Sequence, residues 1–121
     1  MTVFVSIALA SICFTYNGTQ ECHSALLGKP NSVTPVGEFT IDKINVPQKG
    51  YGGNVLRFYE NDEAIWAIHR VYLGNPAEKR LDRLKGKNLK DKFITNGCIN
   101  VLPEVYDKLV ACCENSALVI K

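Results

Sequence analysis

Apolar residues in this chain of 121 residues recur mostly with the spacing of β-strands. Runs rich in Val, Ile, Phe and Thr are bounded by Gly, Pro and Asn, which is typical of strands joined by turns. The pattern predicts strands within residues 2–27, folding back at Asn17-Gly18, and at 38–45, 56–59, 64–71 and 117–120. Within the first region, Val3–Cys13 is interpreted as a single strand.

Two segments carry a helical pattern instead. Pro103 is typical of a first helical turn, and the apolar residues after it share one face: Val105, Leu109, Cys112 and Cys113, with Tyr106 and Val110 beside it. Residues 76–90 alternate charged residues with leucines, which predicts a short surface helix ending near Gly86. The chain is therefore expected to fold as a mostly β domain with one main helix and one charged helical insertion.

Composition indicates one ordinary domain over residues 1–121, with 46% hydrophobic and 21% charged residues. The net charge is only +2, but half of the basic residues lie close together: Lys79, Arg80, Arg83, Lys85, Lys87, Lys90 and Lys92. This cluster has two interpretations, a solvated helical surface or a basic rim over a site for an anionic polymer. Nucleic acid is not the expected polymer, because only Phe93 adds an aromatic ring, at the edge of the cluster.

The five cysteines are an odd number, so at least one is free or paired outside the chain, and Cys98 is the obvious candidate. Cys13 and Cys22 flank the Asn-Gly turn, and with Tyr16 opposite Thr19 they would face each other within reach of a disulfide. A disulfide there would indicate an oxidising compartment, and two reduced strand residues are an equal alternative. Cys112 and Cys113 are expected in the core.

The N-terminal apolar run has some features of an export signal. Ala8-Leu9-Ala10 mimics a cleavage site, but no Lys or Arg precedes Lys29. The run is also too short to span a bilayer. It is therefore interpreted as a strand, with no stable membrane insertion expected.

The most informative motif is Thr95-Asn96-Gly97-Cys98-Ile99-Asn100. A cysteine directly after a glycine in a short polar turn suits a nucleophilic thiol, and His69, which ends an apolar run, suits the base that would form an ion pair with it. The backbone N–H groups of Gly97 and Cys98 are candidate donors to an oxyanion, and Asn100 is expected to bond backbone groups of the turn. A structural histidine at a strand end is the alternative for His69.

The sequence offers less support for a functional role of His23 and for a metal site. His23 is expected to be a surface or structural residue. The cysteines lack the spacing of zinc ligands, so no metal site is expected.

This motif, with its upstream histidine, resembles the L,D-transpeptidase (YkuD-type) catalytic domain. Further segments agree in order along essentially the whole chain: Asn17-Gly18, Gly28-Lys29-Pro30, Thr34-Pro35-Val36-Gly37-Glu38-Phe39-Thr40-Ile41 and Ala67-Ile68-His69. The resemblance implies a β-rich sandwich or barrel that acts on peptidoglycan stem peptides in the periplasm or cell envelope, without a cofactor.

The resemblance also implies roles for individual residues. Cys98 would attack the L-centre carbonyl of diaminopimelate in a tetrapeptide stem, release D-alanine and pass the acyl group to a neighbouring stem as a 3→3 cross-link. His69 would be the base, oriented by a backbone carbonyl, and Gly97 would contribute to the oxyanion hole. Thr95, Asn96 and Asn100 would be the motif positions around it, and Tyr51, Arg70 and Tyr72 candidate lining of the substrate groove. Carbapenems would acylate Cys98.

Two departures from the family pattern leave the acyl acceptor open. Asn96 stands where the commonest motif has a histidine, and the stretch Arg70–Ile94 is longer than in most members. If water resolves the thioester, the protein is a peptidoglycan hydrolase (a carboxypeptidase, endopeptidase or amidase), and a secreted antibacterial effector is one form of this reading. A non-catalytic wall-binding module is the third alternative.

Overall fold

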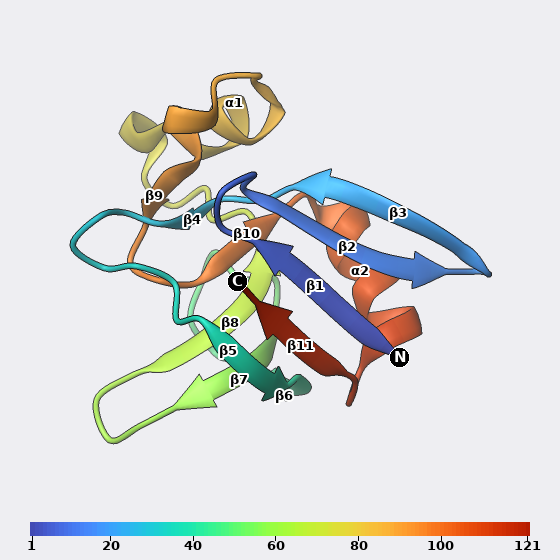
Figure 1. The fold of residues 1–121 in the computed structure, drawn as a ribbon. Coiled ribbons are helices and arrows are strands. Elements are labelled where there is room, and N and C mark those ends of the chain that lie inside the picture. Colours follow the sequence, from blue (N-terminus) through green and yellow to red (C-terminus); the bar gives the residue numbers. More distant parts are fainter.

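The computed structural model describes residues 1–121 as two sheets and two α-helices (Figure 1). The larger sheet has the strand order β3-β2-β1-β11-β5, in which only β1 and β11 pair in parallel. Its strands are β1 (Thr2–Ser6), β2 (Ser11–Tyr16), β3 (Thr19–Ser24), β5 (Gly37–Thr40) and β11 (Ala117–Ile120).

The smaller sheet has the order β10-β8-β7-β6, with β10 parallel to β8. Its strands are β6 (Asp42–Asn45), β7 (Asn54–Glu60), β8 (Ile65–Arg70) and β10 (Ile99–Val101). A separate short pair joins β4 (Leu27–Gly28) to β9 (Phe93–Thr95). The hairpin of β7 and β8 confirms the predicted strands over 56–59 and 64–71, whereas β9 and β10 lie in a region for which no strand was expected.

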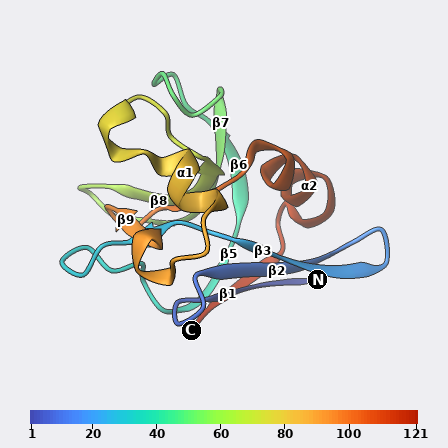
Figure 2. The same cartoon turned by 90° about the horizontal axis from the view of Figure 1, so that it is seen from above.

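Helix α2 (Pro103–Cys113) closes the core between the two sheets. It packs against both β2 and β8, and Figure 2 shows it beside the smaller sheet and above β1–β3. Its buried residues are Val105, Tyr106, Leu109 and Cys113, which confirms most of the predicted apolar face, whereas Val110 and Cys112 are only partly buried. The buried residues of α2 join the inward-facing residues of both sheets in one core of 19 buried residues. The mostly β fold with one main helix and a charged insertion is thus confirmed.

The predicted strand over residues 38–45 is divided at Ile41. This residue is fully buried, and its backbone bonds to Ser116 O and the Asn115 N–H instead of continuing a ladder. β5 therefore pairs with β11 in the larger sheet, and β6 pairs with β7 in the smaller one. A single apolar run thus contributes one strand to each sheet, because the chain crosses from the larger to the smaller sheet at Ile41.

The interpretation of Val3–Cys13 as one strand is wrong. A turn at residues 7–10 separates β1 from β2, which then pair antiparallel. The Ser6 hydroxyl accepts a hydrogen bond from the Leu9 N–H, and Ala10 takes a φ of 46°. The turn lacks Gly, Pro and Asn, so Ser6 was its only local signal.

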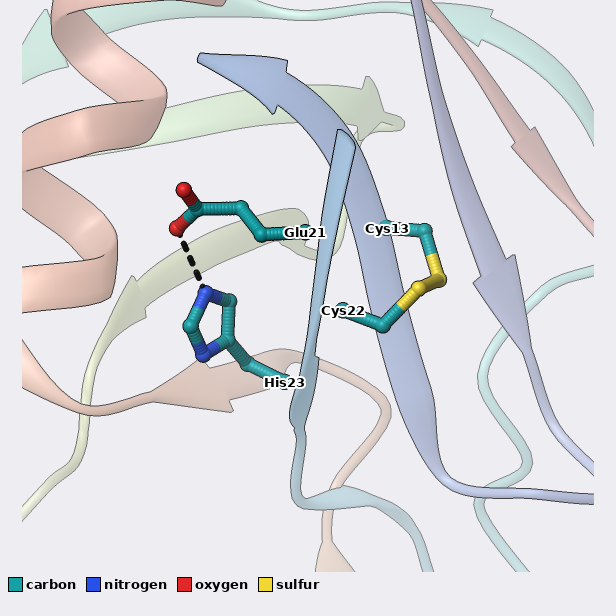
Figure 3. The surroundings of a disulfide bond; sticks show 4 residues. All are labelled: Cys13, Glu21, Cys22 and His23. Atoms are coloured by element: carbon teal, nitrogen blue, oxygen red, sulfur yellow. Dashed lines mark hydrogen bonds and ion pairs between the residues drawn. A yellow bond between two sulfur atoms is a disulfide. The ribbon is translucent and has the colours of Figure 1, made fainter. Parts of the chain in front are cut away.

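The first hairpin has the expected register. Asn17 and Gly18 both have positive φ, Tyr16 lies opposite Thr19, and Cys13 lies opposite Cys22. Cys13 and Cys22 form a disulfide on one face of the hairpin, and Figure 3 shows Glu21 and His23 pointing from the other.

The other cysteine prediction holds in part. Cys113 is fully buried, but Cys112 is only partly buried. The two are joined to each other by a disulfide that the sequence did not indicate. Cys98 is left as the free cysteine, as expected.

The insertion contains α1 (Arg80–Lys85) between two 3₁₀ helices, η1 (Pro76–Glu78) and η2 (Leu89–Lys92), and α1 ends at Gly86 as predicted. Three of its seven basic residues are structural. Arg83 donates to backbone oxygens, and Lys92, only 4% exposed, donates to three carbonyls at the end of α1. Arg80 points into the molecule. Neither a wholly solvated surface nor a continuous basic rim describes this cluster.

No helix here has both the length and the apolar content to cross a bilayer.

Candidate active site

Cys98 lies in the turn that links β9 to β10. The Thr95 hydroxyl holds this turn, because Oγ1 accepts from the Gly97 N–H at 3.0 Å and donates to the Cys98 carbonyl at 2.7 Å. Gly97 has a φ of +120°, and a Cβ there would lie 2.6 Å from Nε1 of Trp66. Only glycine fits both the backbone angle and the space, so the residue before Cys98 is set by geometry.

A second threonine supports the turn from the loop after β4. Thr34 is 1% exposed, and its hydroxyl accepts from the Gly28 N–H at 2.9 Å and donates to the Gly97 carbonyl at 3.0 Å. A Cβ at Gly28 would overlap the Ser32 carbonyl oxygen, so the loop needs glycine there as well. Segments about 60 residues apart in sequence thus meet behind Cys98.

His69 lies on β8, where it pairs with Asn100 of β10, and is only 3% exposed. Its Nδ1 is 2.7 Å from the Arg70 carbonyl oxygen. Because a carbonyl oxygen only accepts, Nδ1 carries the proton and the neutral ring keeps its lone pair on Nε2. Tyr51 packs edge-on against the ring, with 4.7 Å between ring centroids.

Cys98 and His69 open into the same cavity of about 180 Å³. The rest of its lining is mostly apolar: Val46, Gln48, Tyr51, Val55, Ile65 and Ala67. The sulfur lies 3.9 Å from the Ile65 carbonyl oxygen, and no hydrogen bond joins Cys98 to His69. The cavity therefore presents a partly exposed thiol and an imidazole to one ligand.

Burial favours the neutral forms of both groups. It raises the pKa of the Cys98 thiol, although a hydrogen bond from the Ala67 backbone and the charge of Arg80 lower it in part. The pKa of His69 is lowered from 6.5 to about 4, mainly by burial and also by the positive charge of Arg80, whereas the hydrogen bond to the Arg70 carbonyl acts to raise it. The expected ion pair is therefore not the resting state of this site, and proton transfer would accompany attack on a substrate.

Of the two backbone N–H groups expected to bind an oxyanion, that of Gly97 differs from the expectation. The Gly97 N–H is already bonded to Thr95 Oγ1, so it is not free to bind an oxyanion. The hydrogen bonds of the turn leave the Cys98 N–H for that role. Gly97 contributes through its backbone conformation instead.

Asn100 also differs from expectation, because it does not bond to the turn. Its side-chain oxygen accepts from the Tyr72 N–H at 3.1 Å and from Nη1 of Arg80 at 3.0 Å. Its Nδ2 lies 3.4 Å from Nε2 of His69. This fully buried amide thus links the histidine to the insertion.

The three candidate groove residues have different positions. Tyr51 lines the cavity, whereas the Tyr72 ring lies tilted against that of Tyr51, with 5.5 Å between centroids, and lines a second cavity on the insertion. Arg70 lies outside the cavity, since adjacent strand residues point to opposite faces, and its guanidinium covers the Tyr106 ring at 4.3 Å. Asn96 is exposed and its side chain makes no hydrogen bond.

Sequence reasoning missed three residues of this site. Thr34 was seen only as part of a motif, Trp66 only as part of an apolar run, and Arg80 only as one charge in a basic cluster. A buried threonine among prolines carries no local sign of its distant partner. For Arg80, the sole signal was its place in the unusually long insertion.

His23 lies apart from the cavity, with its ring 5.7 Å from that of Phe14 and Nε2 2.7 Å from Glu21, so the structural interpretation fits it. No group of three or more His, Cys, Asp or Glu side chains is placed to hold a metal ion.

Comparison with known proteins gives a structural match without a sequence match. No protein-family model and no curated protein matches the chain. Among solved structures, an L,D-transpeptidase from Enterococcus faecium matches with a TM-score of 0.72 at 16% identity, covering 99% of this chain and 49% of that one. One from Mycobacterium tuberculosis H37Rv gives 0.68 at 18% identity, covering 99% and 57%. One from Stackebrandtia nassauensis (Yku) gives 0.62 at 19%, covering 99% and 54%.

Nearly the whole chain therefore has the fold of an L,D-transpeptidase catalytic domain. The chain spans about half the length of these solved structures.

Proposed function

We propose that this chain is an L,D-transpeptidase that acts on peptidoglycan stem peptides, with Cys98 as nucleophile and His69 as base. One observation carries the proposal. The free cysteine opens into the same cavity as a buried imidazole whose Nδ1 proton is held by a backbone carbonyl. That arrangement leaves Nε2 as the proton acceptor, which is what activation of a neutral thiol requires.

The first half-reaction is acylation. Cys98 Sγ attacks the carbonyl carbon of the L-centre of diaminopimelate in a tetrapeptide stem, and its proton passes to Nε2 of His69. The Cys98 N–H donates to the oxyanion of the tetrahedral intermediate. As the intermediate collapses, the C–N bond breaks, the proton moves from His69 to the leaving amine, and D-alanine departs from a thioester.

The second half-reaction resolves the thioester. The amine of a neighbouring stem attacks the acyl carbon, loses a proton to His69 and displaces the Cys98 sulfur, which is reprotonated. The product is a 3→3 cross-link. Water in place of the amine would give a hydrolase.

Two further observations support this reading. Related structures include an L,D-transpeptidase in complex with imipenem and one with a faropenem-derived adduct, so β-lactams are suitable probes of Cys98. The Cys13–Cys22 disulfide favours an oxidising location such as the periplasm or cell envelope.

The test is a digest of purified disaccharide-tetrapeptide read by mass spectrometry, with Cys98→Ala alongside. A cross-linked dimer that has lost one D-alanine is expected. Loss of D-alanine without a dimer would make the protein a hydrolase. If neither product forms, cross-linked sacculus is the next substrate, and a protein that leaves it uncut and keeps its mass in imipenem would be the wall-binding module.

Variants separate the two roles. Cys98→Ala should abolish acylation and turnover while the fold is kept. His69→Ala should slow acylation by about 10²–10⁴-fold, the usual contribution of a general base. The matched control is His23→Ala, which removes the other histidine far from the cavity and should leave the rate unchanged. Activity retained in Cys98→Ala would exclude the mechanism.

A further inference from the structure

Arg80 connects the charged insertion to the candidate base. It is the first residue of α1, and its side chain is only 12% exposed. Nε lies 3.0 Å from Glu78 Oε1, and Nη1 lies 3.0 Å from Asn100 Oδ1. The guanidinium also lies over the Tyr72 ring, at 5.5 Å. Its direction is therefore set by partners on three sides.

The bonds around Asn100 fix which way its amide faces. Its oxygen accepts from two groups that can only donate, the Arg80 guanidinium and the Tyr72 N–H. The amide NH₂ must then face the other way, toward Nε2 of His69 at 3.4 Å. An NH₂ group can only donate, so it favours a ring nitrogen that carries a lone pair.

The opposite side of the ring gives the same result. The Arg70 carbonyl at Nδ1 can only accept, so it holds the proton there. The imidazole is thus bound at both ends in the tautomer that leaves Nε2 unprotonated. A proton on Nε2 would face the Asn100 NH₂ and lose that hydrogen bond.

We infer that Arg80 is a positioning residue of this site, which holds the Asn100 amide so that its NH₂ faces Nε2 of His69 and keeps the resting ring neutral; the thiol proton would displace this hydrogen bond when it reaches Nε2. The inference rests on the proposed role of His69 as the base. It gives the insertion a function in the site, because without α1 the orientation of the amide would depend on the Tyr72 N–H alone.

Few other ionisable groups bear on this ring. Tyr51 contacts it from the loop after β6, and Cys98 shares its cavity from the turn before β10. The guanidinium of Arg70 is turned to Tyr106 and Asp107. Arg80 is the cation that opposes protonation of His69.

The test is the protonation of His69, read by long-range ¹H–¹⁵N spectra of the ¹⁵N-labelled chain over about pH 4–8, the range of histidine titration. The chain has only two histidines, so His23 is an internal reference in every sample. In the unchanged chain, His69 should show a protonated Nδ1 and an unprotonated Nε2, and should titrate near pH 4.

In Arg80→Leu only the Tyr72 N–H still holds the Asn100 oxygen, so the amide can turn more readily and offer that oxygen to a proton on Nε2 of the charged ring. The opposing charge is also lost. The pKa of His69 should therefore rise by about one unit or more, a tenfold change in proton affinity. Arg80→Gln, which can still donate to Asn100 but carries no charge, should give a smaller rise.

Arg83→Leu is the matched control, since it removes a guanidinium from the same helix whose bonds go to the Glu78 and Asp91 carbonyls. It should leave His69 as in the unchanged chain. If Arg80→Leu and Arg80→Gln both titrate like Arg83→Leu, the inference is wrong. If Arg80→Leu fails to fold, the comparison of Arg80→Gln with Arg83→Leu decides it.

The experiment needs no substrate, so it separates this inference from the proposed function. A raised pKa in a protein that imipenem does not acylate would leave the positioning role standing and remove the transpeptidase. In an active protein, the acid limb of the acylation rate should move to higher pH in Arg80→Leu, by the same interval as the titration of His69.

Discussion

The hydroxyl of Thr34 offers a direct test of how the turn that carries Cys98 is held. Thr34→Val keeps the shape of the side chain but removes both of its hydrogen bonds, to the Gly28 N–H and the Gly97 carbonyl. Both groups are buried, and valine gives them no new partner. The substitution therefore tests the loss of hydrogen bonds to two backbone groups, with almost no change in side-chain volume.

The expected loss can be worked from these two bonds. Leaving a buried donor or acceptor unsatisfied costs about 1–3 kcal/mol, so with two such groups the free energy of unfolding should fall by about 2–6 kcal/mol. With a urea m-value of about 2 kcal/mol/M, the middle of the range for small proteins, the unfolding midpoint should drop by roughly 1–3 M. Trp66, the single tryptophan, lies against Gly97 and reports unfolding by its fluorescence.

Thr40→Val is the matched control, because Thr40 lies exposed on β5 and its side chain makes no hydrogen bond. Its unfolding free energy should change by less than about 0.5 kcal/mol. Thr34→Val should also slow acylation of Cys98 by about 10- to 100-fold, since misplacement of a reacting atom is costly. Equal midpoints for the two variants would refute the reasoning.

Three further predictions concern stability. Burial lowers the pKa of His69 from 6.5 to about 4, so on acidification the unfolded chain takes up a proton at this histidine before the folded chain does. The stability contributed by neutral His69 is therefore fully present above about pH 6.5, and the free energy of unfolding falls by about 3 kcal/mol as the pH approaches 4. In His69→Gln, the free energy of unfolding measured by urea titration should depend less on pH between about 6.5 and 4. An unchanged dependence on pH would contradict the lowered pKa of His69. Reduction should shift the mass of the peptides holding Cys13 and Cys22, and replacing both by alanine should cost about 2–3 kcal/mol by the chain-entropy relation; no mass shift would contradict the disulfide. Lys92→Met should lower stability by about 2–3 kcal/mol and speed hydrogen exchange in α1, whose last carbonyls lose their donor, and unchanged exchange there would argue against that role.

Several features of this protein were determined by short stretches of sequence. Asn17-Gly18 set the first hairpin and, through its register, the position of Cys13 opposite Cys22, whereas the disulfide between them was left open. Pro103 and the spacing that follows it set α2 and its buried face. The Gly97-Cys98 turn identified the candidate nucleophile. Each of these depends on backbone preferences or spacings within about ten residues, which is why the sequence alone was sufficient.

Tertiary structure decided what depends on distant partners. The strand over 38–45 is divided because Ile41 bonds to residues beyond α2, and the break between β1 and β2 has no glycine or proline to mark it. The Gly97 N–H was expected at an oxyanion, but Thr95 occupies it.

The position of a side chain around the cavity also depended on the tertiary structure. Arg70 was expected in the groove. Adjacent residues of a strand point to opposite faces of the sheet, however, so His69 points into the cavity and Arg70 points away from it. Thr34 and Arg80 look unremarkable in the sequence and acquire their roles from hydrogen bonds to Gly97 and Asn100. The sequence named the thiol and the imidazole, whereas the protonation of both is set by burial and by groups that only the folded chain brings to them.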